Sequence, residues 1–184
     1  MGIAAGMASE GHLVITTTFA PFQTMRCCEQ IKVNLGYMMQ NVKMVGLASG
    51  VVQGSLGYTH NSIEDLSIMR SIPNIVVLSP ADSTETAKAI YAALKYNGPV
   101  YIRLTGGSNN PAVYSDNYDF EIGKSILLLE GKGIVLFSTG TMVHKCLLVA
   151  SELKEKGFSV AVIDMHTIKP IDEGRIKKVC SYAK

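Results

Sequence analysis

Short apolar segments rich in β-branched residues alternate with segments of helical spacing along the whole chain. The predicted strands of the first part are residues 13–17, 42–47, 75–78 and 100–104. Residues 23–39 and 81–96 predict helices, and Asp82 or Ser83 is suited to cap the second of them. A chain that alternates in this way is expected to form a mainly parallel sheet with helices on both faces.

The composition changes after the last of these strands. Residues 106–122 are predicted to form a linker, because the stretch is rich in Gly, Asn, Ser and Asp. The predicted elements of a second αβ unit are a strand at 133–138, a helix at 142–156 and a strand at 159–163. We therefore predict an α/β chain of two three-layer αβα units with mainly parallel sheets, residues 1–105 and 123–184, both of them truncated.

The composition argues against two classes of function. The chain has 184 residues, of which 47% are hydrophobic and 17% charged, and its net charge is +2. It has no basic run with interleaved aromatic residues, so nucleic-acid binding has no support. No apolar stretch approaches the roughly 20 residues of a membrane span. The four cysteines show no C-x-x-C spacing, which predicts reduced thiols in a cytoplasmic protein and no metal site.

One loop carries the residue types of a reactive site. Residues 57–65 read Gly-Tyr-Thr-His-Asn-Ser-Ile-Glu-Asp, so an imidazole lies between a flexible glycine and a helix with an acidic first turn. Histidine titrates near neutral pH, so His60 can accept a proton from a reacting hydroxyl group or donate one to it. The alternative interpretation is a helix-capping loop with a surface histidine.

This loop is followed by Arg70-Ser71-Ile72-Pro73-Asn74, and together the two segments resemble the transketolase family of thiamine-diphosphate enzymes. Further segments that match the family, in order, are residues 79–82, 98–103, 138–143 and 164–172. Several independent motifs in register are more specific than any single motif. The resemblance implies a transketolase-like pyrimidine-binding domain and the start of a transketolase C-terminal domain, as in the C-terminal subunit of a split transketolase.

The resemblance assigns roles to four residues. In the segment Thr18-Phe19-Ala20-Pro21-Phe22, Phe19 and Phe22 would line the pocket for the aminopyrimidine of thiamine diphosphate, with Phe22 stacking on that ring. His60 would be the catalytic, substrate-facing imidazole, and Arg26 would bind the substrate or orient the loop. Without the resemblance, core packing for the phenylalanines and a solvated helix face for Arg26 are equally good interpretations.

The family also implies groups that this chain would not supply. The glutamate that activates the cofactor would fall just before Met1, and the domain that holds the diphosphate through Mg²⁺ would belong to a partner subunit or domain. The implied activity is transfer of a two-carbon ketol unit between sugars by a homo- or hetero-oligomer, with this chain inactive on its own. Leu56, Ala48 and Gly106 stand where transketolases carry an acid, a histidine and an arginine for the sugar or its phosphate, so the sugar itself is not specified.

Two alternatives remain open. The first is the beta subunit of a 2-oxo-acid dehydrogenase or a deoxyxylulose-phosphate synthase-like enzyme, although Ile102-Arg103-Leu104-Thr105 and residues 165–170 favour transketolase. The second is a non-catalytic subunit that acts as an interaction module, an interpretation that the missing glutamate and Leu56 would support.

Overall fold

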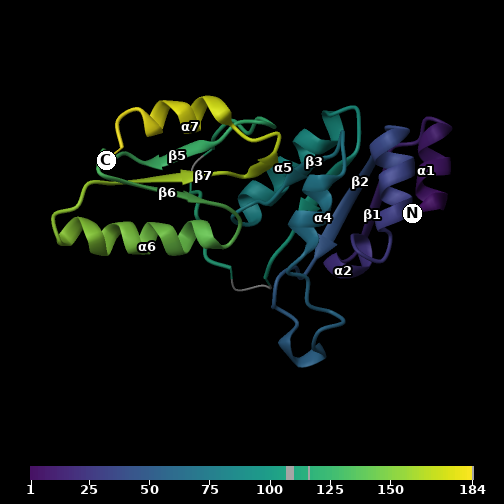
Figure 1. The fold of residues 1–184 in the computed structure, drawn as a ribbon, viewed down its shortest axis with the longest axis horizontal. Coiled ribbons are helices and arrows are strands. Elements are labelled where there is room, and N and C mark those ends of the chain that lie inside the picture. Colours follow the sequence, from purple (N-terminus) through teal and green to yellow (C-terminus); the bar gives the residue numbers. More distant parts are fainter. Residues whose placement is uncertain (107–109, 116, 184) are drawn as a thin grey trace.

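The computed structural model describes residues 1–106, 110–115 and 117–183, and it shows two α/β units next to each other (Figure 1). The prediction of a mixed α/β fold with parallel strands and helices is confirmed. The linker predicted at 106–122 lies partly outside the described residues, and so does the last residue of the second predicted unit.

The element boundaries are as follows. The helices are α1 (Gly2–Ser9), α2 (Ala20–Gln23), α3 (Cys28–Gln30), α4 (Asp65–Ser71), α5 (Ser83–Lys95), α6 (Met142–Glu155) and α7 (Glu173–Cys180), with a π-helical segment η1 (Ile31–Tyr37) and a 3₁₀ turn η2 (Gly54–Leu56). The strands are β1 (Val14–Phe19), β2 (Val42–Leu47), β3 (Val76–Leu78), β4 (Val100–Arg103), β5 (Ile126–Leu129), β6 (Ile134–Ser138), β7 (Val160–Asp164) and β8 (Thr167–Lys169). Asp82 caps α5 as predicted, because its side chain accepts a hydrogen bond of 2.8 Å from the backbone N–H of Glu85.

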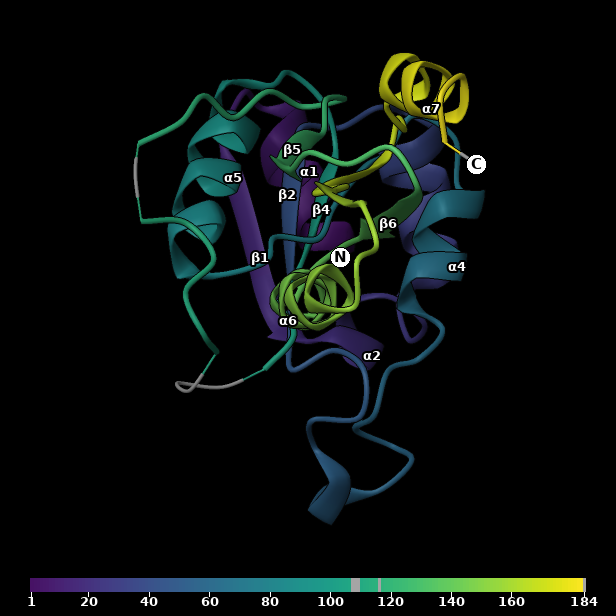
Figure 2. The ribbon, with the colours of Figure 1, turned by 90° about the vertical axis from the view of Figure 1, so that its left-hand side faces the viewer.

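The first unit is built on a sheet with the strand order β1-β2-β4-β3-β8. Strands β1, β2, β4 and β3 run parallel, with Val14 opposite Val42 and Lys43 opposite Val100. In Figure 2, α5 lies on one side of these strands and α4 on the other. Because parallel strands align their carboxyl ends, the segments that follow β1, β2 and β4 all leave from the same edge of the sheet.

Strand β8 is additional to the prediction. It lies between β7 and α7 of the second unit in sequence, but it pairs antiparallel with β3 of the first unit, with Val77 opposite Lys169. A strand of three residues that ends before Pro170 is too short to show a periodicity in the sequence. Its pairing joins the two units through backbone hydrogen bonds.

The prediction of a single helix at residues 23–39 is wrong. The chain forms the end of α2, then α3 and η1 in this region, with residues 24–27 in turns. Two side chains bond to backbone carbonyls near the break: Thr24 Oγ1 donates to Ala20 O at 2.7 Å and Cys27 Sγ to Phe22 O at 3.5 Å. Local bonds of this kind compete with a continuous helix.

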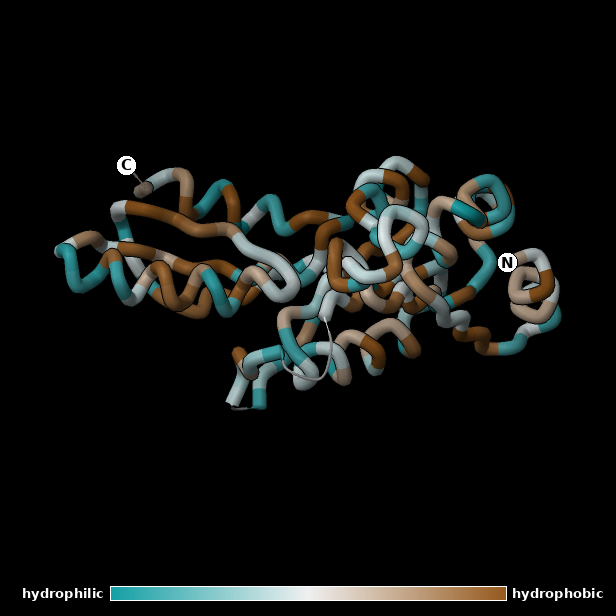
Figure 3. The backbone as a smooth tube through the Cα atoms, turned by 90° about the horizontal axis from the view of Figure 1, so that it is seen from below, coloured by the Kyte–Doolittle hydropathy of each residue, from teal (hydrophilic) through white to brown (hydrophobic). Residues whose placement is uncertain are grey.

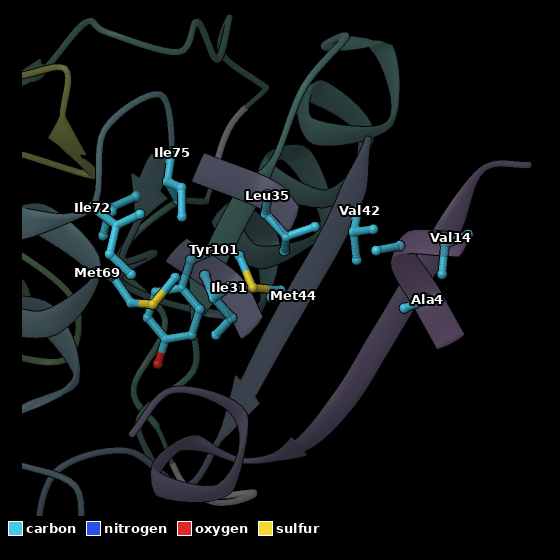
Figure 4. Close-up of a cluster of buried hydrophobic side chains, with 12 residues drawn as sticks. Ala4, Val14, Ile31, Leu35, Val42, Met44, Met69, Ile72, Ile75 and Tyr101 are labelled. Atoms are coloured by element: carbon cyan, nitrogen blue, oxygen red, sulfur yellow. The ribbon is translucent and has the colours of Figure 1, made fainter. Parts of the chain in front are cut away.

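The core of the first unit lies between the sheet and its helices (Figure 4). Met44 of β2, Ile31 of η1 and Met69 of α4 are fully buried around the ring of Tyr101. The hydroxyl group of Tyr101 reaches the edge of this cluster and donates to Asp65 at 2.8 Å. The ring therefore contributes to the core while its polar group keeps a hydrogen-bond partner.

The second unit has a three-stranded sheet in the order β5-β7-β6, in which β7 runs parallel to β6 and antiparallel to β5. Figure 3 shows hydrophobic residues along these strands, whereas α6 alternates between hydrophobic and hydrophilic turns. Helices α6 and α7 lie on opposite sides of the sheet (Figure 1). Strands β6 and β7 and helix α6 agree with the prediction to within one residue at each end, and β5 and α7 are additional to it.

Two buried carboxyl groups meet where the units join. Asp164 ends β7 in the second unit and Glu85 lies on α5 in the first, and both side chains are fully buried. Tyr114 Oη donates to Asp164 at 2.7 Å and Tyr118 Oη to Glu85 at 3.2 Å. Burial, and next the charge of Asp164, raise the pKa of Glu85 from 4.5 to about 9. Glu85 is therefore protonated at neutral pH and can donate to Asp164, whose own pKa is raised by burial.

We predict that this pair makes the folded chain more stable at acid than at alkaline pH. Because the pKa of Glu85 is higher in the folded than in the unfolded chain, its contribution is complete below pH 4.5 and is lost as the pH rises to about 9. Glu85→Gln keeps a donor but does not titrate. The melting temperature of the wild type relative to this variant should fall by at least about 2–4 °C across that range, the shift expected for 1 kcal/mol in a chain of this size.

The matched control is Glu152→Gln, which changes an exposed carboxylate on α6. The difference in melting temperature between wild type and this control should stay constant with pH. If the melting temperatures of the wild type and Glu85→Gln changed in the same way with pH, the two carboxyl groups would not share a proton.

Candidate functional site

The loop between β2 and α4 projects from the carboxyl edge of the first sheet (Figures 1 and 2). It spans residues 48–64 and contains the turn η2. Gly57 follows η2 with a φ of 69°, a conformation that favours glycine. The backbone N–H groups of His60 and Asn61 donate to its carbonyl at 3.1 and 3.2 Å. This turn returns the chain to the sheet, where His60 meets the end of β1.

His60 packs against two aromatic rings from the segment that leaves β1. The ring centroids of Phe19 and Phe22 lie 5.6 and 5.1 Å from that of His60. The two phenylalanine rings lie 5.9 Å apart with an interplanar angle of 80°. All three contacts have the edge-to-face geometry that aromatic rings favour. The structure therefore brings together three residues that the sequence singled out as site residues.

Arg26 joins this cluster above the ring of Phe22. Its guanidinium carbon lies 3.8 Å from the ring centroid, which is the geometry of a cation–π contact. One face of the ring is therefore covered. A flat ligand that stacks on Phe22 must use the other face or displace the guanidinium group.

A pocket of about 340 Å³ opens beside Phe22. Its walls are formed by Pro21, Phe22, Met25, Arg26, Tyr58, Thr59, Asn61 and Glu64. The apolar side chains suit a flat heteroaromatic group, and the hydroxyl, amide and charged groups suit a ligand rich in hydroxyls. Asn61 Oδ1 is one of five buried side-chain atoms without a hydrogen-bond partner among the described residues, and it can accept a bond from a ligand in this pocket.

The prediction from sequence did not include Asn61, Glu64, Met25 or Tyr58 as site residues. Each lies close in sequence to a residue that it did include, and that proximity was the available signal. The sequence does not show which polar neighbour of His60 points into the pocket, because the conformation of the turn at Gly57 determines that direction.

The other histidines lie outside the cluster of Phe19, Phe22 and His60. His166 is buried beside Phe120, with ring centroids 4.1 Å apart, and burial lowers the pKa of His166 from 6.5 to about 4. It is therefore a neutral side chain of the junction. His12 is exposed before β1, and His144 lies on α6.

The described residues contain no group of three or more His, Cys, Asp or Glu side chains arranged to hold a metal ion. Within the same part of the chain, no helix is long and apolar enough to cross a membrane. Leu56 is 49% exposed at the end of η2, and Ala48 is buried at the start of the loop. Neither side chain offers a polar contact to a sugar.

Two family models match the chain. They are the transketolase pyrimidine binding domain over residues 1–110 and the transketolase C-terminal domain over residues 123–182. The chain is 42% identical over 175 residues to a 6-deoxy-6-sulfo-D-fructose transketolase subunit of Clostridium sp. (strain MSTE9), covering 94% of this chain and 53% of that protein. It is 37% identical over 179 residues to an apulose-4-phosphate transketolase subunit of Phocaeicola vulgatus, covering 97% of this chain and 57% of that protein.

A solved structure supports the same relationship. The inactive β4 tetramer of a split-gene transketolase matches with a TM-score of 0.91 and 36% identity, covering 100% of this chain and 59% of that one. The chain thus spans little more than half the length of these relatives. Because the family models cover both units and the relatives match nearly end to end along this chain, the chain belongs to the transketolase family, with matches to its pyrimidine-binding and C-terminal domains.

Proposed function

We propose that this chain supplies one wall of a thiamine-diphosphate site and works with a diphosphate-binding partner to transfer two-carbon ketol units between sugars. The observation that carries the proposal is the cluster of Phe19, Phe22 and His60 beside a pocket in a chain of this family. When bound, the cofactor would supply the electron sink for carbon–carbon cleavage. The residues of the chain would bind and orient its ring and the sugar.

The pocket fits the aminopyrimidine ring. Phe22 offers an aromatic face, and Asn61 Oδ1 is a buried acceptor without a partner among the described residues. A flat ring with an exocyclic amino group can stack on the first and donate to the second. Phe19 contacts both Phe22 and His60 edge-on, so it supports the orientation of the other two rings.

The diphosphate and Mg²⁺ would be held by the partner subunit or domain. The chain matches the pyrimidine-binding and C-terminal domains of the family, and neither is the domain expected to hold the diphosphate. Val51, Tyr58 and Ile63 of the loop are 69%, 80% and 68% exposed, and apolar side chains of this kind gain by being covered. The relative that forms an inactive β4 tetramer supports a homo- or hetero-oligomer in which this chain alone is inactive.

His60 and Arg26 would face the sugar. Thr59 Oγ1 lies 3.0 Å from His60 Nδ1, so Nε2 is the nitrogen left to bond a carbonyl or hydroxyl oxygen of the substrate. Arg26 is the one cation among the described residues that line the pocket, where Glu64 is the anion. Two relatives are named for a sulfonated and a phosphorylated sugar, and an arginine suits either group.

We also propose a cytoplasmic location, because all four cysteines are free. The main alternative function is a non-catalytic subunit that completes an oligomer. The exposed Leu56 at a position where transketolases carry an acid favours it. Kinetics of the complete complex separate the two functions.

The first test measures ketol transfer with and without a partner. The purified chain with thiamine diphosphate and Mg²⁺ should show no turnover, because the diphosphate and the metal ion are proposed to be held by the partner. Addition of the diphosphate-binding subunit should restore turnover. Activity of the chain alone would contradict the divided site, and an inactive complex would favour the non-catalytic subunit.

The second test replaces His60 by alanine in the complete complex. The kcat/KM should fall by roughly 10²–10⁴-fold, the range expected for a positioned acid–base group. Cofactor affinity should hardly change, because the backbone of the loop is retained. His12→Ala removes an exposed imidazole and serves as the control. A loss of less than about threefold would assign His60 to the loop alone.

The third test concerns the stacking face. Phe22→Leu should weaken thiamine-diphosphate binding by roughly 2- to 13-fold, which corresponds to about 0.5–1.5 kcal/mol of aromatic stacking. Folding should survive, since leucine keeps most of the apolar volume. Phe120→Leu at the junction makes the same exchange away from the pocket and should leave the affinity unchanged. Unchanged affinity with a lowered melting temperature for Phe22→Leu would assign Phe22 to the core.

A further inference from the structure

The two legs of the loop that carries His60 are tied together at their base. Gly50 and Ser62 exchange two backbone hydrogen bonds, each of 2.8 Å. This pairing closes the segment 51–61 into one unit. The direction in which that unit projects is then set by the residues that flank it, Ser49 on the outgoing leg and Asp65 on the returning leg.

The end of β4 holds both legs. Arg103 Nε donates to Asp65 Oδ2 at 2.8 Å, and Nη1 of the same guanidinium donates to Thr105 Oγ1 at 2.7 Å. Thr105 Oγ1 also bonds Ser49 Oγ, and the backbone N–H of Ser49 donates to Leu104 O at 3.0 Å. The planar guanidinium group of Arg103 therefore contacts the returning leg directly and the outgoing leg through Thr105.

The ion pair beneath the loop is shielded from water. The side chain of Asp65 is fully buried and that of Arg103 is 15% exposed. Tyr101, in the core, donates a further bond of 2.8 Å to the same oxygen of Asp65. A buried carboxylate keeps its position because loss of its partner leaves an uncompensated charge. The guanidinium group and Asp65 thus link the loop to the buried core of the first unit.

We propose that Arg103 and Thr105 are positioning residues, which hold the loop so that His60 packs on Phe19 and Phe22. The contact of these three rings depends on the loop direction, because His60 lies in the loop after β2, whereas Phe19 ends β1 and Phe22 lies on α2. The consequence for catalysis rests on the proposed function, since it requires His60 to face the substrate.

The first experiment follows the Cε1–H signal of His60 by NMR in the 184-residue chain. Aromatic rings shift the resonance of protons beside them, so this signal should differ from that of the exposed His12. Its assignment is the line that is lost in His60→Ala. Arg103→Lys keeps a charge beside Asp65 but lacks the planar guanidinium group, and Thr105→Val keeps the shape but removes the link. In both variants the His60 line should move toward the His12 line.

The control is Lys43→Met, which weakens the same sheet away from the loop. Lys43 is buried at the start of β2, where its ammonium group donates to the carbonyls of Tyr96 and Gly98 at 2.7 and 2.6 Å. The His60 line should stay in place in this variant. An unchanged line in a folded Thr105→Val chain, or an equal displacement in Lys43→Met, would overturn the proposal.

The second experiment is a double-mutant cycle in the complete complex. Arg103→Lys should lower kcat/KM by about 10- to 100-fold, since a misplacement of about 1 Å can cost 10²-fold. In the His60→Ala background the same change should cost less than about threefold, because its effect acts through His60. An equal loss in both backgrounds would reject the positioning role. If the wild-type complex showed no ketol transfer, the proposed function would be rejected. The NMR experiment would still test whether Arg103 and Thr105 hold the loop in position.

Discussion

The parallel pairing of β1, β2 and β4 is the constraint on which the candidate site depends. Val14 lies opposite Val42 and Lys43 opposite Val100, so the carboxyl ends of the three strands lie together. Phe19 ends the first of these strands, the loop follows the second, and Arg103 ends the third. Residues 19 and 60 are distant in sequence, and they touch because of this alignment. A slip by one residue would turn the side chains of a strand to the other face of the sheet.

A shifted pKa does not mark the candidate site of this chain. Burial raises the pKa of both Glu85 and Asp164, and such shifts are often a sign of function. Three of their four oxygens, however, accept bonds from Tyr114, Tyr118 and the backbone N–H of Ala81, and Asp164 Oδ1 has no hydrogen-bond partner among the described residues. The carboxyl pair therefore belongs to the junction of the two units.

The sequence predicted most of the elements because hydrophobic periodicity is a local property. Strands β2, β6 and β7 and helices α5 and α6 are long enough to show it. The prediction from sequence failed where an element is very short or where a specific hydrogen bond determines the structure. Strand β8 is set by its partner β3, and the helix expected at 23–39 is broken where Thr24 and Cys27 bond to the backbone. These effects leave little trace in the pattern of apolar residues.

The site residues divide in the same way. The resemblance to a family selected Phe19, Phe22, Arg26 and His60, and the structure brings these four together. No pattern in the sequence indicated that Asn61 Oδ1 would be buried without a partner among the described residues. Nor did the sequence suggest Arg103 as an anchor, because its contacts with Asp65 and Thr105 require the paired strands.

Arg26 limits what stacking on Phe22 can contribute. Its guanidinium already lies 3.8 Å above the ring, and such a contact at an exposed site is worth about 0.5–1 kcal/mol. Aromatic stacking on the same ring contributes about 0.5–1.5 kcal/mol beyond burial, so a ligand that displaces Arg26 gains little from the exchange alone. A ligand that stacks on the opposite face keeps both interactions. Stacking on Phe22 therefore contributes most to binding when Arg26 stays in place.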